Sequence, residues 1–163
     1  MAAAISGGEQ IDWEQGLVQR ARRGDNHAFE RLYREHVGRV YGLCLRLTRD
    51  PAHAEDCAQE TFINAWRALD RFETRSSINT WLHRIAVNVV LGKRRRVTPK
   101  MESLADSDEP ADFNWSLDTP VEVSEIETAI ARLPEGGRDV LVLSGFYGYS
   151  HVETAEMLGV AEG

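Results

Sequence analysis

The sequence predicts an all-α protein in which a flexible acidic linker joins two small helical domains. Apolar residues recur at spacings of three and four through most of the chain, which is the period of one buried helix face. Residues that start and end helices bracket these segments. Between the two groups, residues 97–123 contain three prolines and seven acidic residues without a helical period. We therefore expect helical domains over 12–96 and 124–163.

The first helices follow a small, polar leader, residues 1–11, that we expect to be disordered. Asp12 is the predicted cap of a short helix that ends at Gly24. The next helix is the longest and starts at Asp25 or Asn26. Its apolar stripe runs over about five turns and should supply much of the core.

The central pair of helices spans Asp50 to Arg96 and carries the most distinctive chemistry. Asp50 and Pro51 are a strong helix start, because aspartate caps free backbone N–H groups and proline suits the first helical position. The outward face of the first of these helices carries Asp56, Gln59, Glu60, Ile63 and Arg67. Such a row is usually a solvated face.

The second helix of this pair buries an apolar side and carries cations and amides on the other. The polar set is Arg84, Asn88, Lys93, Arg94, Arg95 and Arg96. Consecutive cations at a helix C-terminus complement the macrodipole, but they also repel one another and favour a polyanionic partner such as a phosphate backbone. Both interpretations stay open on the pattern alone.

The last segment again reads as helices. Ser124 and Glu127 match a capping box, and Pro134 ends that first helix. A second helix is expected from about Glu135 to Phe146, before Gly148. Ser150 is the predicted cap of a third helix that Gly159 closes.

Charge and composition limit the function classes. The net charge is −7, but residues 1–100 carry +5 and residues 101–163 carry −12, which is typical of a nucleic-acid-contacting domain tied to an acidic segment.

Cys44 and Cys57 lack metal or redox spacing, and we expect reduced core thiols, no metal site and no cofactor. With no catalytic constellation, a binding protein is expected rather than an enzyme. Without a spanning segment or secretory signal, it should be cytoplasmic.

Two motifs in the central helices carry a resemblance to a known family. The stretches AEDCAQETFINAWRALDRF and TWLHRIAVN resemble the second domain of bacterial RNA polymerase sigma factors, in particular the extracytoplasmic-function (ECF) group of the sigma-70 family. The later stretch ARLPEGGRDVLVLSGFYGYSHVETAEMLGV resembles the front part of the fourth sigma domain, a helix-turn-helix. In that family a recognition helix follows, and it would begin just beyond Gly163. The resemblance thus implies a partial helix-turn-helix domain.

The resemblance also implies roles for particular residues. The core polymerase would be bound, through the clamp helices of its largest subunit, by Asp56, Gln59, Glu60, Ile63 and Trp66. Trp66 could equally be a core residue. The loop from Glu73 to Asn79 would receive a flipped base through Arg75, Ser76, Ser77 and Asn79. Arg84, Asn88 and the cations from Lys93 to Arg96 would bind DNA. For Trp81, core packing is favoured over base stacking.

The implied function is that of an ECF sigma factor, which binds RNA polymerase core at its clamp helices and flap and directs promoter recognition and melting. An anti-sigma factor is a further expected partner. Two alternatives stay open: a polymerase-binding competitor or anti-sigma-bound fragment that cannot select promoters, and a helical DNA-binding repressor independent of polymerase.

Overall fold

The structure is a computed structural model of the 163-residue chain, and it describes residues 7–101 and 121–160. All regular structure within these ranges is helical, which confirms the predicted all-α class. The elements in order are α1 (Gly7–Arg22), α2 (Asn26–Thr48), α3 (Pro51–Ala68), the 3₁₀-helix η1 (Leu69–Arg71), α4 (Ile78–Met101), α5 (Val121–Ala131), α6 (Glu135–Leu141), the π-helix η2 (Val142–Phe146) and α7 (His151–Leu158).

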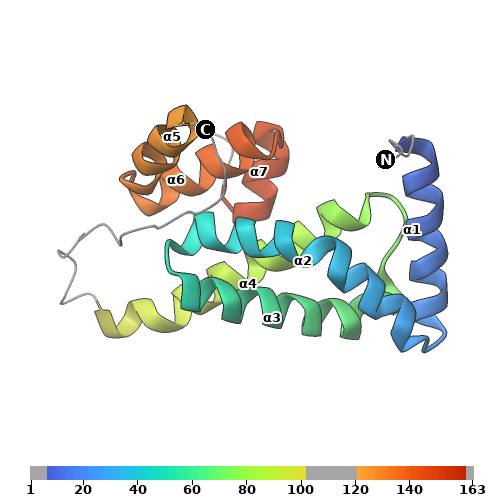
Figure 1. Ribbon diagram of the computed structural model, residues 1–163. Coiled ribbons are helices and arrows are strands. Elements are labelled where there is room, and N and C mark those ends of the chain that lie inside the picture. The colour runs from blue at the N-terminus through green and yellow to red at the C-terminus, as the bar shows by residue number, and fades with distance from the viewer. Residues whose placement is uncertain (1–6, 102–120, 161–163) are drawn as a thin grey trace.

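The first four α-helices form a bundle in which α2, α3 and α4 lie side by side and α1 crosses one end (Figure 1). Two of the predicted helix starts, at Asp25 and Asp50, are found in this bundle. The predicted cap Asp12 was wrong, because α1 begins at Gly7 and Asp12 lies inside it. The Asp25 carboxylate accepts hydrogen bonds from the backbone N–H groups of His27 and Ala28, and Asp50 does the same for Ala52 and His53. Each bond satisfies a backbone donor that has no partner inside the helix.

The bundle core is filled by the apolar faces that the periodicity predicted. Leu43 and Leu47 of α2 and Val87 of α4 are almost completely shielded from solvent. Cys44 and Cys57 are free thiols in this core, and burial raises the pKa of Cys44 to about 12. A thiol with so high a pKa is a packing group rather than a nucleophile.

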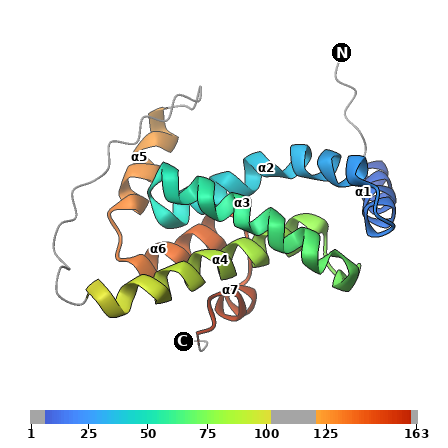
Figure 2. The same cartoon turned by 90° about the horizontal axis from the view of Figure 1, so that it is seen from below.

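The last three α-helices, with η2, form a unit that we call the C-terminal module (residues 121–160). Figures 1 and 2 show this module packed against α2 and α4, on the side of the bundle opposite α3. Ser150 forms the predicted cap of α7, in a full capping box with Glu153. Gly148 and Gly159 have φ angles of 72° and 66°, a left-handed conformation that glycine adopts without strain.

Several boundaries differ from the sequence-based expectation. Helix α1 begins at Gly7, so the backbone of residues 7–11 is helical although we expected it in the disordered leader. Helix α4 continues to Met101, past the predicted domain end at Arg96. Helix α5 begins at Val121, which places Ser124 inside the helix, so the predicted capping box was wrong. Helix ends are set by a few weak local preferences, which neighbouring turns readily extend.

Some expectations lie outside the described residues. These include the leader at 1–6 and the middle of the predicted linker at 102–120. Among the helices that the structure describes, none combines the length and the apolar character needed to cross a membrane.

Candidate functional site

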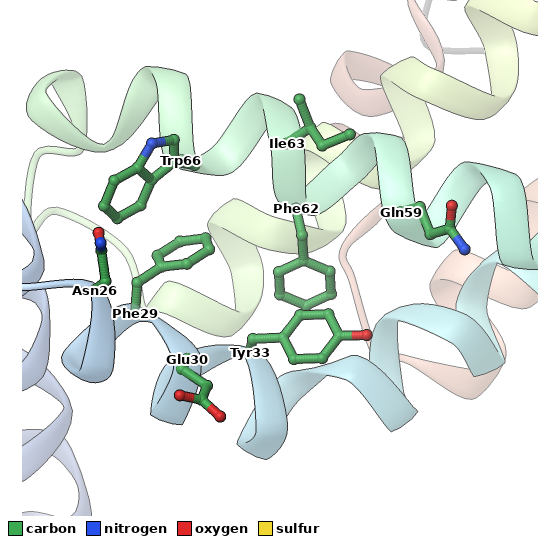
Figure 3. Close-up of a pocket in the computed structure, with 8 residues that line it drawn as sticks. All are labelled: Asn26, Phe29, Glu30, Tyr33, Gln59, Phe62, Ile63 and Trp66. Carbon is green, nitrogen blue, oxygen red and sulfur yellow. The ribbon is translucent and has the colours of Figure 1, made fainter.

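An open groove lies between α2 and α3, and we call it the α2/α3 groove. It has a volume of about 560 Å³. Figure 3 shows the side chains that line it, which are Asn26, Phe29, Glu30 and Tyr33 from α2 and Gln59, Phe62, Ile63 and Trp66 from α3. Three of the five residues assigned to polymerase binding therefore lie together in one groove.

Two aromatic pairs form the floor of the α2/α3 groove. The rings of Phe29 and Trp66 meet edge to face with centroids 4.7 Å apart, and those of Tyr33 and Phe62 do so at 4.8 Å. This geometry is favourable for aromatic rings, so the pairs hold the two helices together. Phe62 is buried, whereas Trp66 is 40% exposed and belongs to the surface as well as to the packing.

Ile63 adds to the apolar surface, because 51% of it is exposed one turn from Trp66 on the same helix. Large apolar side chains gathered around a groove on the surface of a soluble domain mark a binding site more often than isolated ones do. The α2/α3 groove is therefore suited to receive an apolar ridge from a partner.

The two acidic residues of the predicted polymerase set lie elsewhere on α3. Asp56 is exposed but does not line the groove. Glu60 faces α4, where its carboxylate lies 3.2 Å from the Lys93 ammonium group. This ion pair links one predicted polymerase-binding residue to one predicted DNA-binding residue.

The loop before α4 holds the residues predicted to receive a base. Arg75 is exposed and its guanidinium lies 2.8 Å from the carboxylate of Glu73. The Ser77 hydroxyl accepts a hydrogen bond from the backbone N–H of Thr80 and so caps α4. Ser76 is half-buried. Asn79 has a buried side-chain oxygen without a partner among the described residues.

The polar residues predicted along α4 fall into two groups. Arg84, Asn88, Arg95 and Arg96 are exposed and accessible to a polyanion. Lys93 and Arg94 are half-buried and paired. The four consecutive cations therefore do not act as one exposed cluster. Trp81 is half-buried against Phe72, with ring centroids 4.9 Å apart, which supports the core interpretation.

The Arg94 guanidinium is held by the C-terminal module and by the end of α2. Its Nη1 donates to the Asp139 carboxylate at 2.5 Å, and its Nε lies 2.7 Å from the carboxylate of Glu135. Its Nη2 donates to the carbonyl oxygen of Leu47 at 2.6 Å and also reaches Asp139 at 3.2 Å. Every nitrogen of this guanidinium is thus engaged.

Arg138 and Asp139 had no predicted role, yet both are buried. Arg138 donates to the Leu47 carbonyl at 3.2 Å, beside Arg94. Burial raises the pKa of the Asp139 carboxyl, against the lowering effect of Arg94, and burial lowers the pKa of the Arg138 guanidinium. Two adjacent charged residues near the start of a short helix are usually exposed to solvent. The spacing of apolar residues therefore gave no indication that these two would be buried.

Two further polar clusters join the C-terminal module to the bundle. The Arg46 guanidinium donates to Glu127 at 3.0 Å and to the Tyr147 hydroxyl at 2.9 Å, and it lies over the Phe146 ring. His83 Nδ1 lies 2.7 Å from the Tyr149 hydroxyl. Among the described residues, no cluster of three or more His, Cys, Asp or Glu side chains could hold a metal ion.

Comparisons with known proteins fit this arrangement. The family described as Sigma-70 region 2 matches residues 32–98, and the family described as Sigma-70, region 4 matches residues 124–163. The ECF RNA polymerase sigma factor SigM of Mycobacterium tuberculosis is 35% identical over 141 residues, which are 86% of this chain and 70% of the relative.

Solved structures show the same likeness. CnrH in complex with the cytosolic domain of CnrY has a TM-score of 0.59 and 25% identity, covering 91% of this chain and 84% of that one. An engineered region 2 of sigmaE in complex with GTAAAA has a TM-score of 0.52 and 32% identity, covering 63% of this chain and 99% of that one.

Proposed function

Because this chain belongs to the ECF group of the sigma-70 family of RNA polymerase sigma factors, we propose that the α2/α3 groove binds the polymerase core. The chain binds RNA polymerase and directs it to promoters, so the open question is which surfaces do so. We place this activity in the cytoplasm and assign it no catalysis of its own. The clamp helices of the largest polymerase subunit are the partner that we propose for the groove.

The observation that carries this proposal is the exposure of Ile63 and Trp66 at one groove. A partner helix can lay an apolar ridge into such a surface, and binding energy then concentrates in a few large side chains. Gln59 supplies polar contacts in the groove, and Asp56 places negative charge beside it, whereas Glu60 is paired with Lys93. A basic partner would meet this rim and gain orientation from it.

Promoter DNA is proposed to bind the loop from Glu73 to Asn79 and the exposed side of α4. Arg84, Arg95 and Arg96 can reach phosphates there, and such contacts make affinity fall steeply with salt. Ser76 and Asn79 line the loop beside them, and we propose that they contact an unstacked base. The similar sigmaE region 2 was solved with GTAAAA, which supports this assignment.

We also propose the division that the sequence suggested, with residues 12–96 as the polymerase- and promoter-binding domain and 124–163 as part of the fourth sigma domain. The similar protein CnrH was solved with CnrY, and we propose that a comparable anti-sigma protein binds this chain.

The test of the groove is binding of the full chain to purified RNA polymerase core. The double variant Ile63→Ala/Trp66→Ala should bind at least about tenfold more weakly, because two exposed apolar anchors are lost. Arg67→Ala is the matched control, since Arg67 is exposed on the same helix but does not line the groove. Circular dichroism should show that all three proteins keep their helical content.

Equal binding by the double variant and the wild type would contradict the groove assignment. Equal weakening by Arg67→Ala would also contradict it, because the effect would then not be specific to the groove.

A further inference from the structure

We propose that the end of the bundle where α1 meets η1 is a further DNA contact, at which Arg23 and Arg71 bind phosphates of the strand that passes the loop from Glu73 to Asn79. We call this surface the α1/η1 corner and define it by these two arginines. The proposal rests on the proposed function of the loop. It extends the DNA-binding surface beyond the loop, on the side away from the cations of α4.

The last turn of α1 is fixed to η1 by a side chain. The Arg22 guanidinium is half-buried, and its Nε donates a hydrogen bond of 3.0 Å to the Leu69 carbonyl. The same carbonyl accepts the backbone N–H of Phe72 at 3.1 Å, which closes the turn of η1. Figures 1 and 2 both show α1 beside the segment that joins α3 to α4. The Arg22 hydrogen bond therefore brings Arg23 and Arg71 to the same end of the bundle.

The two guanidinium groups of the α1/η1 corner are available to a partner. Arg23 and Arg71 are exposed, and no carboxylate in the described part of the chain forms an ion pair with either. Arg20 lies 2.7 Å from Asp25, so that carboxylate is already neutralised. Asp70 is exposed beside Arg71, but the two arginines outnumber it. Exposed guanidinium groups with an excess of positive charge attract a polyanion and lose little hydration when they bind it.

The α1/η1 corner is continuous with the loop that is proposed to receive an unstacked base. Only Phe72 separates Arg71 from Glu73, where that loop begins. Phe72 is 5% exposed and its ring packs on Trp81 of α4, so η1 and the start of α4 are fixed on the two sides of the loop. A strand that enters the loop along the cations of α4 would therefore leave it at the corner.

A phosphate backbone is the partner that this surface fits. A guanidinium group binds two phosphate oxygens at once and needs no pocket to do so. Contacts to phosphates hold a strand in place without reading its sequence, so the α1/η1 corner should add affinity and no base preference. It shares no residue with the α2/α3 groove, and polymerase and DNA therefore do not compete for the same side chains.

The experiment measures binding of the full chain to fluorescein-labelled single-stranded DNA by fluorescence anisotropy across a salt series. The short probe is GTAAAA, with which the similar sigmaE region 2 was solved, and two long probes carry a run of thymidines on its 5′ or 3′ side. Arg23→Gln/Arg71→Gln should bind at least one long probe about fivefold more weakly than the wild type does. The salt dependence should fall by about two phosphate contacts, and affinity for the short probe should not change.

Two further proteins separate the α1/η1 corner from a general effect of charge. Arg39→Gln/Arg132→Gln is the matched control, because it removes two exposed arginine charges from the middle of α2 and from the residue after α5. It should bind all three probes as the wild type does. Arg23→Lys/Arg71→Lys keeps both charges and should retain most of the affinity for the long probes. Circular dichroism should show that every variant keeps its helical content.

The proposal is overturned if Arg23→Gln/Arg71→Gln binds every probe as the wild type does, or if it weakens the short probe as much as the long ones. Equal weakening by the matched control would also overturn it. Failure of the proposed function looks different, because Arg84→Gln/Arg95→Gln would then leave binding of the short probe unchanged. Absence of DNA binding by every protein, the wild type included, would overturn both.

Discussion

The surfaces that flank α2 on its two sides differ in which side chains are exposed. One exposes apolar side chains and the other buries charged ones, the reverse of the usual division into apolar interior and polar exterior. On the side of α3, the α2/α3 groove leaves Ile63 and Trp66 open to solvent. On the side of the C-terminal module, Arg138 and Asp139 are buried, and Arg94 is half-buried and paired with Asp139. An exposed apolar surface is available to another protein, whereas these charged side chains are already paired within the same chain.

The α2/α3 groove and the surface covered by the C-terminal module should also differ in how much their residues contribute to the stability of the fold. Ile63, which is exposed at the groove, should matter little to stability and strongly to binding. Residues of the docked side should matter to stability, because each buried charge depends on its partner. Four predictions test this contrast, from the largest expected effect to the smallest.

The largest effect is expected for Arg94→Ala compared with Arg95→Ala. Removing Arg94 leaves the Asp139 carboxylate buried without its cation, which should lower the free energy of unfolding by about 3 kcal/mol. Arg95 is exposed, and its loss should change that free energy by no more than about 0.5 kcal/mol. Urea unfolding followed by circular dichroism measures both, and equal values would refute the contrast.

Acidification is the next test, because His83 is buried on the docked side. Burial lowers the pKa of His83 to about 4, with His36 and Arg39 adding to the shift. The neutral imidazole is favoured by folding, so its stabilisation is full above pH 6.5 and is lost as pH falls from 6.5 to 4.

At pH 5 this loss should be about 2 kcal/mol of the free energy of unfolding, relative to pH 7. Unfolding of the wild type and of His83→Gln at both pH values measures it, and the variant should lose less. An identical pH dependence in the two proteins would exclude His83 as the source. Of the eight residues that line the α2/α3 groove, none is a histidine, so the groove adds no such dependence.

A smaller effect is expected from one hydrogen bond between the module and the bundle. Tyr149→Phe removes the hydroxyl that lies 2.7 Å from His83 Nδ1, and it should lower the free energy of unfolding by about 1 kcal/mol. Tyr33→Phe removes a hydroxyl at the exposed groove and should change it by less than about 0.5 kcal/mol. Thermal unfolding of the two variants side by side gives the comparison, which a larger loss in Tyr33→Phe would reverse.

The smallest effect on folding should come from Ile63 in the α2/α3 groove. Ile63→Ser shortens a side chain that is 51% exposed, so the free energy of unfolding should fall by about 0.5 kcal/mol or less. A loss as large as that of Arg94→Ala would show that the groove is structural and would remove the basis of the contrast. The same variant should weaken binding to polymerase core.

Sequence reasoning was most successful where structure depends on neighbours along the chain. Asp25, Asp50 and Ser150 were identified as caps, because capping joins a side chain to a backbone group two or three residues away. Ser124 was misassigned, since α5 begins three residues earlier and its expected partner Glu127 binds Arg46 instead. A contact over 81 residues of sequence leaves no local signature.

In the candidate binding surfaces, too, the features that depend on near neighbours in sequence were predicted and those that depend on distant residues were not. The outward row of α3 could be read from helical spacing, and Gln59, Ile63 and Trp66 do lie together. Spacing could not show that Glu60 pairs with Lys93 on another helix. It also could not distinguish the exposed Arg95 from its neighbour Arg94. The two differ in that the carboxylates of Asp139 and Glu135 lie against Arg94, whereas Arg95 faces solvent.

By itself, the sequence determined the helical class, most of the helix starts, the apolar faces and the basic character of α4. These follow from backbone hydrogen bonding and from a period of 3.6 residues, which act over a few positions. Only the tertiary structure decided which cations stay exposed and which are paired with Asp139 and Glu135. That choice depends on how the C-terminal module docks, because a charge is withdrawn from water only where a distant segment supplies its partner.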